Sequence, residues 1–198
     1  MLHFLIILGG VINLFGTLYY LVSMSRGGAK PNRVTWFLWA LAPLICFSAA
    51  LWEGARWSAI PILTAGLGPL FIFSYSFFVK SAYWKLTHLD YACGALSLLA
   101  LIVWFFTKNG SYAIFLMIIT DGLAAVPTFI KAWKHPETES DATFYGALLS
   151  SSAALLSVTD WRFAEFGFPL YLVLMCVTYI AIYRYGRYRV RVRQDIPA

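Results

Sequence analysis

Residues Thr120–Ser140 read TDGLAAVPTFIKAWKHPETES and join an acid, a proline and a charged loop to an apolar run. Asp121 is the one charge between Ser111 and Ile130. An aspartate at the centre of a membrane-spanning helix costs roughly 2.5 to 3.5 kcal/mol on an insertion scale. We therefore expect Asp121 to face protein or water, or to be protonated, and its surroundings become the main question.

The composition places this stretch in a membrane protein. Of the 198 residues 61% are hydrophobic and 12% are charged, and the mean hydropathy is +0.72. These values exclude an ordinary soluble domain. A helix needs about 20 apolar residues to cross a bilayer. The apolar runs predict seven crossings, at residues 2–24, 34–52, 58–79, 89–107, 111–133, 143–160 and 165–184.

Charge in the loops predicts the orientation, because Lys and Arg collect on the cytosolic side. Twelve of them lie in one set of alternate loops and the tail, whereas the opposite set holds Arg56, Lys108 and Arg162. We therefore expect an integral protein of the plasma (inner) membrane, with the N-terminus outside and the C-terminus in the cytosol. The net charge of +6 then reflects topology, and we expect no nucleic-acid partner.

Sliding the chain on itself by 108 residues pairs the first three runs with the last three, and Asn13 with Asp121. Three helices reverse the chain direction, so a fourth is needed to return the second copy to the same orientation. The predicted fold is an all-α integral membrane protein with seven transmembrane helices, as two parallel three-helix bundles joined by a linker helix (3+1+3). The predicted domains are a first bundle at 1–80, the linker at 81–110, a second bundle at 111–187 and a basic cytosolic tail at 188–198.

Pro127 and Thr128 precede a charged loop that runs to Ser140, and the equivalent loop of the first copy reads GGAKPNRVTW, Gly27–Trp36. With the repeat, this pattern resembles the SWEET and PQ-loop superfamily of seven-helix membrane transporters, which includes sugar facilitators, lysosomal amino-acid exporters, nicotinamide riboside transporters and the KDEL receptor. Thr128 stands where the motif has Gln, and the Asn that sugar carriers place on the third helix of each repeat is missing. The resemblance implies a transporter other than a plain hexose facilitator.

Polar side chains mark a face on two of the predicted helices. Asn13, Thr17 and Tyr20 share one side of the first helix, and Asp121 and Thr128 form the matching stripe on the fifth. Both stripes begin near mid-membrane, where transporters hold substrate and coupling ions at the repeat interface. We expect Asp121 to bind substrate and a proton, since a proton would change the cost of exposing it. A hydrogen-bonded acid that fixes helix packing is the alternative.

Trp36, Tyr145 and Thr178 complete the candidate substrate-binding residues. Trp36 and Tyr145 lie, with Trp39 and Phe144, on helices that follow the cytosolic loops. There they either wall a substrate path or sit at the membrane interface, which is the commoner setting for such side chains.

The region after Pro127 offers candidates for a gate. The proline removes a backbone hydrogen bond, either as a hinge or as a static kink. The acids of the next loop are expected to form a solvated face that balances nearby lysines, or to pair with a cytosolic arginine as a gate. These acids are Glu137, Glu139 and Asp141, the lysines are Lys131 and Lys134, and the arginine is Arg26 or Arg33.

Two further stretches favour packing and lipid contact. Small residues on one side of the sixth helix predict close helix packing; they are Gly146, Ser150, Ala153 and Ser157. The tail RYGRYRVRVR, Arg184–Arg193, either binds anionic lipid headgroups or fixes the topology.

The sequence offers no enzyme chemistry. His3, His88 and His135 lie at ends or in loops, and neither H-E-x-x-H nor a phosphate-binding loop occurs. We expect no enzyme, metal or cofactor. The expected function is a transporter or facilitator of a small polar solute by alternating access, with proton coupling through Asp121. A ligand-binding receptor on the same fold, like the KDEL receptor, and a non-transporting scaffold are the alternatives.

Overall fold

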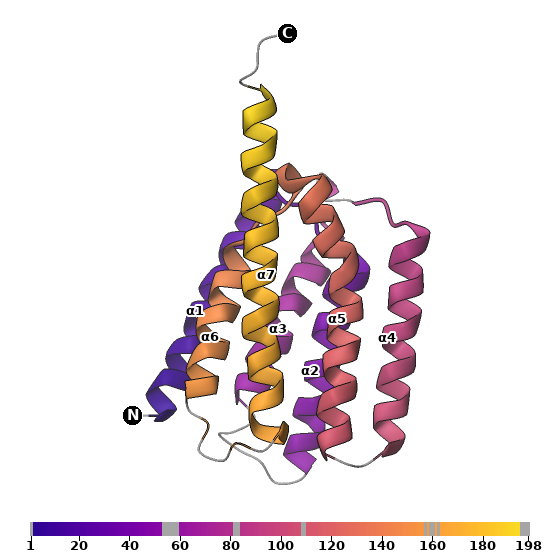
Figure 1. Ribbon diagram of the computed structural model, residues 1–198, viewed down its shortest axis with the longest axis vertical. Coiled ribbons are helices and arrows are strands. Elements are labelled where there is room, and N and C mark those ends of the chain that lie inside the picture. The colour runs from indigo at the N-terminus through magenta and orange to yellow at the C-terminus, as the bar shows by residue number, and fades with distance from the viewer. Residues whose placement is uncertain are drawn as a thin grey trace.

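The computed structural model describes residues 2–52, 60–80, 84–107, 110–156, 158, 161 and 163–194. Within these ranges the chain is helical and contains no strand, as predicted. The elements are α1 (Leu2–Ser25), α2 (Arg33–Trp52), α3 (Ile60–Tyr75), α4 (His88–Thr107), α5 (Gly110–Lys134), the 3-10 helix η3 (Pro136–Thr138), α6 (Ala142–Leu156) and α7 (Phe163–Gln194) (Figure 1).

The helices have the length and surface of a membrane protein. Among the described residues, three helices are long and apolar enough to cross a bilayer, through Ile7–Ser25 of α1, Phe115–Lys134 of α5 and Phe166–Val192 of α7. Large apolar side chains such as Phe15 and Phe106 face outward. An exterior of this kind suits lipid and not water. Seven crossings remain a prediction.

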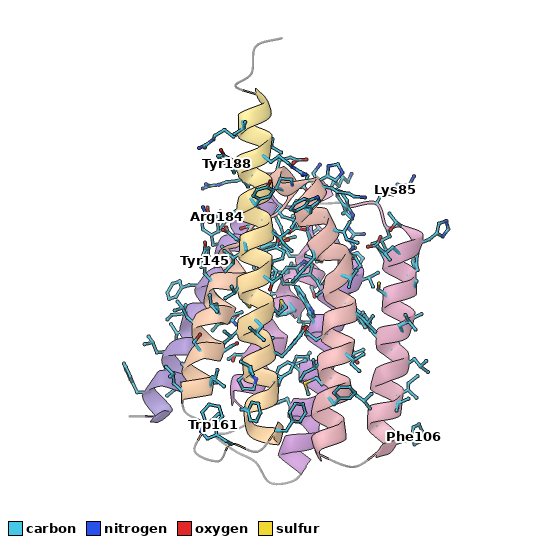
Figure 2. All side chains as sticks on the ribbon, in the orientation of Figure 1. Lys85, Phe106, Tyr145, Trp161, Arg184 and Tyr188 are labelled. Atoms are coloured by element: carbon cyan, nitrogen blue, oxygen red, sulfur yellow. The ribbon has the colours of Figure 1, made fainter. Side chains whose placement is uncertain are left out.

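The two ends of the bundle differ. Lys85, Arg184 and Tyr188 lie toward one end and Trp161 and Phe106 at the other (Figure 2). The three cations predicted for the opposite side, Arg56, Lys108 and Arg162, lie outside the described residues.

Helix α7 is longer than the sequence predicted. The apolar run ends near residue 184, but the helix continues to Gln194 and projects beyond the other helices (Figure 1). Gly186 lies in this extension and packs closely against α5. A Cβ at this position would lie 2.9 Å from the Ala132 carbonyl oxygen. Apolar residues predict where a helix leaves the membrane, and not where the helix ends.

Polar caps begin two of the helices and connect them. Asn32 Oδ1 accepts from the backbone N–H groups of Val34 and Thr35 at the start of α2. The Thr87 hydroxyl donates to Asp90 Oδ2 at 2.6 Å at the start of α4. Asn32 also donates to the Asp90 carboxylate. The N-terminal caps therefore hold α4 against α2.

The packing order is the same in both halves of the chain. α3 packs against α1 and α2, and α7 packs against α5 and α6. The halves meet through α1 on α6 and α2 on α5, while α4 lies at the side, on α5 and α2 (Figure 1).

The contact between α1 and α6 depends on small residues. A Cβ at Gly16 would lie 2.8 Å from the Ala142 carbonyl oxygen, and one at Gly146 would lie 2.9 Å from the Cα of Asn13. Gly9 meets Ser150 in the same way, at 2.9 Å from its Cα. The predicted close packing of α6 is confirmed at Gly146 and Ser150, whereas Ser157 lies outside the described residues.

Candidate functional site

A cavity of about 300 Å³ lies between the two halves of the chain. Its described lining comes from α1, α2, α3, α5, α6 and α7, and none of it from α4. The wall is mostly apolar and aromatic. The lining residues are Asn13, Trp36, Trp39, Pro43, Thr64, Ala65, Pro69, Met117, Asp121, Thr143, Phe144, Ala147, Ser150, Ser151, Ala154, Phe168, Pro169, Leu172 and Met175.

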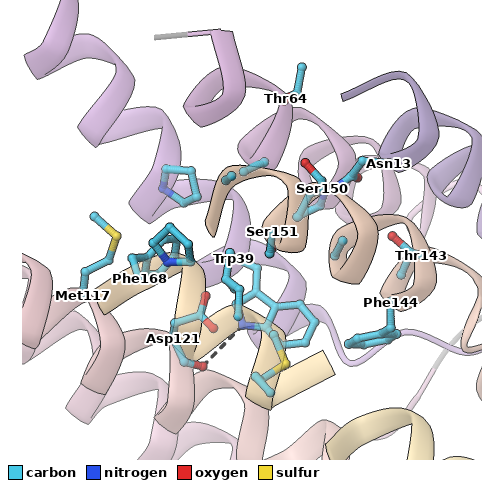
Figure 3. A pocket seen from close by; sticks show the side chains of 18 of the residues that line it. Asn13, Trp39, Thr64, Met117, Asp121, Thr143, Phe144, Ser150, Ser151 and Phe168 are labelled. Atoms are coloured by element: carbon cyan, nitrogen blue, oxygen red, sulfur yellow. Dashed lines mark hydrogen bonds between the residues drawn. The ribbon is translucent and has the colours of Figure 1, made fainter. Parts of the chain in front are cut away.

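Asp121 is the one charged side chain among the described lining residues. Its Oδ2 accepts a hydrogen bond from the Tyr171 hydroxyl at 2.8 Å. Its backbone carbonyl accepts one from Trp39 Nε1 at 3.3 Å, drawn as a dashed line in Figure 3. The residue is 8% exposed. Asp121 therefore faces protein and a cavity, which is the setting that a membrane acid requires.

Asn13, the proposed counterpart of Asp121, lines the same cavity. It lies beside Ser150 on the α6 side, while Asp121 lies beside Trp39 (Figure 3). The glycine contacts between α1 and α6 bring Asn13 to this position. The first residue of each predicted polar stripe, Asn13 on α1 and Asp121 on α5, therefore lines the cavity.

An aromatic cluster forms part of the wall. The ring centroids of Trp36 and Trp39 are 5.2 Å apart, and Phe144 lies 5.8 Å from Trp39. Behind these rings, Tyr20 contacts Trp36 at 5.0 Å and Tyr179 stacks on Phe144 at 3.5 Å. Trp36 and Phe144 are almost completely buried. Of the two interpretations offered for these aromatic residues, the wall of a cavity applies to Trp36, Trp39 and Phe144.

A buried ion pair lies behind the aromatic cluster. Lys131 Nζ is 2.6 Å from Glu139 Oε1, and the two side chains are 1% and 0% exposed. Glu139 Oε2 accepts from the hydroxyls of Tyr20 at 3.0 Å and Tyr179 at 3.4 Å. Lys131 also donates to the carbonyls of Lys30 and Thr138. The pair is thus compensated by hydrogen bonds on both sides, as a buried pair requires.

The expected solvated loop face is wrong for Glu139. The loop folds back under α1 and α7, so their tyrosines take the place of water around this carboxylate. The cation beside it is Lys131, and not the arginine of the alternative gate pair. Glu137 is exposed, as the solvated face predicts, and lies 3.4 Å from the exposed side chain of His135 instead of an expected lysine. The Asp141 side chain is 14% exposed and lies 2.7 Å from Arg184, so both its burial and its partner differ from the prediction.

The remaining predicted site residues do not line the cavity. Thr17 is buried where α1 crosses α3, with its hydroxyl 2.7 Å from the position of a Cβ on Gly68. The Tyr20 hydroxyl donates to Glu139 of the buried ion pair. Thr128 donates to Thr35 Oγ1 at 3.0 Å across α5 and α2. Tyr145 and Thr178 are exposed on the outside of the bundle. Among the eight candidates, the cavity brings together Asn13, Trp36 and Asp121.

Several lining residues were not predicted. Met117 lies one helical turn before Asp121, so helical spacing from the acid could have found it. Phe168, Leu172 and Met175 follow the same spacing along α7. Nothing in their sequence separates the face toward the cavity from the face toward lipid, because both are apolar.

None of the family models, curated proteins and solved structures compared with this chain matches it. Among the described residues, no group of three or more His, Cys, Asp or Glu side chains is placed to hold a metal ion.

Proposed function

We propose that this chain is a membrane transporter of a small polar solute that works by alternating access between two three-helix bundles, α1–α3 and α5–α7, joined by α4. The observation that carries the proposal is the cavity of about 300 Å³, whose described lining comes from all six bundle helices and not from α4. Transporters built from repeats hold their solute at such an interface.

The positions of the lining residues support the repeat. Five lining residues of the first half have a partner 108 residues later that also lines the cavity. The pairs are Asn13 with Asp121, Trp36 with Phe144, Trp39 with Ala147, Pro43 with Ser151 and Thr64 with Leu172. Few pairs are chemically alike, so the two halves share the positions of their lining residues and not the residue types. Two copies of one unit that face a shared cavity would produce this pattern.

Helix order supports the repeat independently. α1 ends at residue 25 and α5 at residue 134, and α2 begins at residue 33 and α6 at residue 142, so both pairs of boundaries lie 109 residues apart. In each half the third helix packs against the other two. This is the layout that the resemblance to the SWEET and PQ-loop superfamily implies.

The buried ion pair is the proposed cytosolic gate. We take the charged end of the bundle as cytosolic and the N-terminus as outside, following the loop charges. Trp36 and Phe144 separate the cavity from Lys131 and Glu139. The gate joins both bundles, because Tyr20 of α1 donates to Glu139 of the loop before α6. Opening toward the cytosol would break these contacts.

Two further parts of the proposal concern ions and lipid. Asp121 would exchange a proton with the cavity and couple its occupancy to transport. A second hollow of about 560 Å³ on α7 is bordered by the acids Glu137 and Asp141 and by the arginines Arg184, Arg187 and Arg191. Anionic lipid headgroups would bind these arginines at the cytosolic surface.

Transport is tested with purified protein in sealed liposomes. A thermal-shift screen of sugars, amino acids, vitamins, nucleosides and amines selects ligands, and their flux is then measured against protein-free vesicles. We expect saturable flux of at least one ligand. Saturable binding with no flux would contradict transport and favour the receptor alternative. An absence of both would favour a scaffold.

A further inference from the structure

The charge of the cavity wall has one sign. Among the described lining residues Asp121 is charged, and none is Lys, Arg or His. Among the described residues, the group that donates to its carboxylate is Tyr171, which does not itself line the cavity. An ionised carboxylate in an apolar wall is costly unless it is paired. A positively charged ligand would supply the missing counter-charge, whereas an anion would be repelled.

The wall beside Asp121 is aromatic. The indole of Trp39 lies next to Asp121, because Trp39 Nε1 donates a hydrogen bond to the backbone carbonyl of Asp121 (Figure 3). Trp36 and Phe144 continue the aromatic surface. Aromatic faces attract cations that lie within about 6 Å of the ring centroid. The same surface suits the apolar groups that surround the charge of an organic cation.

We propose that the cavity binds a small organic cation, an amine or a quaternary ammonium, whose charge lies between the Asp121 carboxylate and the indoles of Trp36 and Trp39. This inference rests on the proposed transport function and narrows its solute class. The cavity volume of about 300 Å³ is at the small end of known ligand sites, which span about 300 to 1,000 Å³.

Other solutes fit the wall less well. A sugar requires hydrogen-bonding groups around most of its surface. The hydroxyl groups among the described lining residues come from α3 and α6 alone, so they would contact only part of a sugar. Asp121 lies on α5 beside aromatic and apolar side chains. A divalent metal ion requires several oxygen or nitrogen ligands, and the described acids and histidines do not gather in threes.

The test compares three probes that share one branched head of similar size. Choline carries a permanent positive charge, 3,3-dimethylbutan-1-ol is its neutral isostere, and glycine betaine adds a negative charge. Binding to the purified full-length protein is measured by calorimetry and by tryptophan fluorescence. We expect choline to bind about tenfold more tightly than the other two, or better, because it alone pairs with the carboxylate without repulsion. Equal affinity for choline and the alcohol, or no saturable binding of choline, overturns the proposal.

Variants locate the charge within the protein. Asp121→Asn should weaken choline binding by about tenfold or more and leave the weak binding of the alcohol within about twofold. Asp121→Glu retains the charge and should restore most of the affinity. Glu137→Gln removes an exposed acid outside the cavity and should change neither affinity. Unchanged choline affinity in Asp121→Asn, with the protein still folded by its melting curve, overturns the proposal.

Flux separates this inference from the proposed function. Choline binding that depends on Asp121, without choline flux, supports the ligand class and contradicts transport. Flux of a neutral or anionic solute, with no preference for choline, supports transport and overturns the ligand class.

Discussion

At the scale of single residues, Asp121 connects three helices and the cavity. Its carboxylate is bound by Tyr171 of α7 and its carbonyl by Trp39 of α2. Both bonds could form with an aspartic acid or an aspartate. Only the aspartate, however, attracts a cation. Proton and cation therefore compete for one group, which is the simplest way to couple them.

The affinity for choline should consequently fall as pH is lowered. A proton on Asp121 removes the charge that binds choline, so the affinity declines by at most about tenfold per pH unit for one site. In Asp121→Asn the affinity should be low and independent of pH. Calorimetry at a series of pH values measures both profiles.

The control for this profile concerns the other groups near Asp121. On α7 they are Tyr171, which donates to the Asp121 carboxylate, and the buried thiol of Cys176, which lies near it. Trp39 on α2 and Asn13 on α1 have no titratable side chain. The contact with α4 is made by Ser97 and Thr120, which have none either. Cys176→Ser should keep the wild-type profile. A pH profile that persists in Asp121→Asn would assign the proton to another group.

The ion pair of Lys131 and Glu139 predicts a stability effect. Glu139→Gln leaves Lys131 buried without its counter-charge, which costs about 3 to 5 kcal/mol. The double variant Lys131→Met/Glu139→Gln removes both charges and should recover most of the loss. Thermal unfolding in detergent measures the series. The exposed pair offers the matched control, because Glu137→Gln should shift the melting temperature little. A double variant no more stable than Glu139→Gln would contradict this account.

Sequence reasoning found residues of the cavity wall where their chemistry was local. Asp121 and Asn13 were identified because an isolated polar group in an apolar run requires an explanation. Glu139 was misassigned because its partners are distant: Tyr20 lies 119 residues away in sequence and Tyr179 lies 40 away. A loop sequence rich in acids says nothing about which helices fold over it.

At the scale of elements, apolar runs located the helices within a few residues, as at α2, predicted at 34–52 and found at Arg33–Trp52. The main exception is α7, where the charged tail continues the helix to Gln194. Helix faces were harder to predict. In a membrane protein the sides toward lipid and toward a ligand cavity are both apolar, so periodicity does not distinguish them.

Pro127 offers a prediction for α5. The helix continues through it from Gly110 to Lys134, and the next residue, Thr128, contacts Thr35 of α2. Pro127→Ala restores a backbone hydrogen bond and should stiffen the helix beside this contact. We expect severalfold slower flux with unchanged choline affinity, measured in liposomes and by calorimetry. Val126→Ala, at an exposed position of the same helix, should leave flux unchanged. Equal flux in Pro127→Ala and the wild type would show that the kink is static.

At the scale of the whole molecule, the two halves meet at unequal contacts. α1 and α6 approach closely through glycines, whereas α2 and α5 are connected by side-chain hydrogen bonds through Thr35, Thr128, Trp39 and Asp121. Backbones packed through glycine have little room to change. Hydrogen-bonded contacts can be exchanged for others. Movement between the halves is therefore expected at α2 and α5.

A crosslink at that contact tests whether the halves move. The hydroxyl oxygens of Thr35 and Thr128 are 3.0 Å apart, so Thr35→Cys/Thr128→Cys should form a disulfide on oxidation, in a background without Cys46, Cys93 and Cys176. Oxidation should reduce flux to the level of empty vesicles, and a reducing agent should restore it, because the crosslink prevents α2 and α5 from separating.

The matched control joins α4 to α5 at a contact that alternating access does not require to open. Ser97 donates to the Thr120 carbonyl at 3.0 Å and Thr120 donates to the Ser97 carbonyl at 3.4 Å, which places the two residues opposite each other for the pair Ser97→Cys/Thr120→Cys. Oxidation of this pair should leave flux unchanged. If the oxidised Thr35→Cys/Thr128→Cys protein transports as fast as the reduced one, α2 and α5 do not separate during transport. The moving contact would then have to lie elsewhere between the halves, either at the glycine crossing of α1 and α6 or where Trp36 and Trp39 of α2 meet Phe144 of α6.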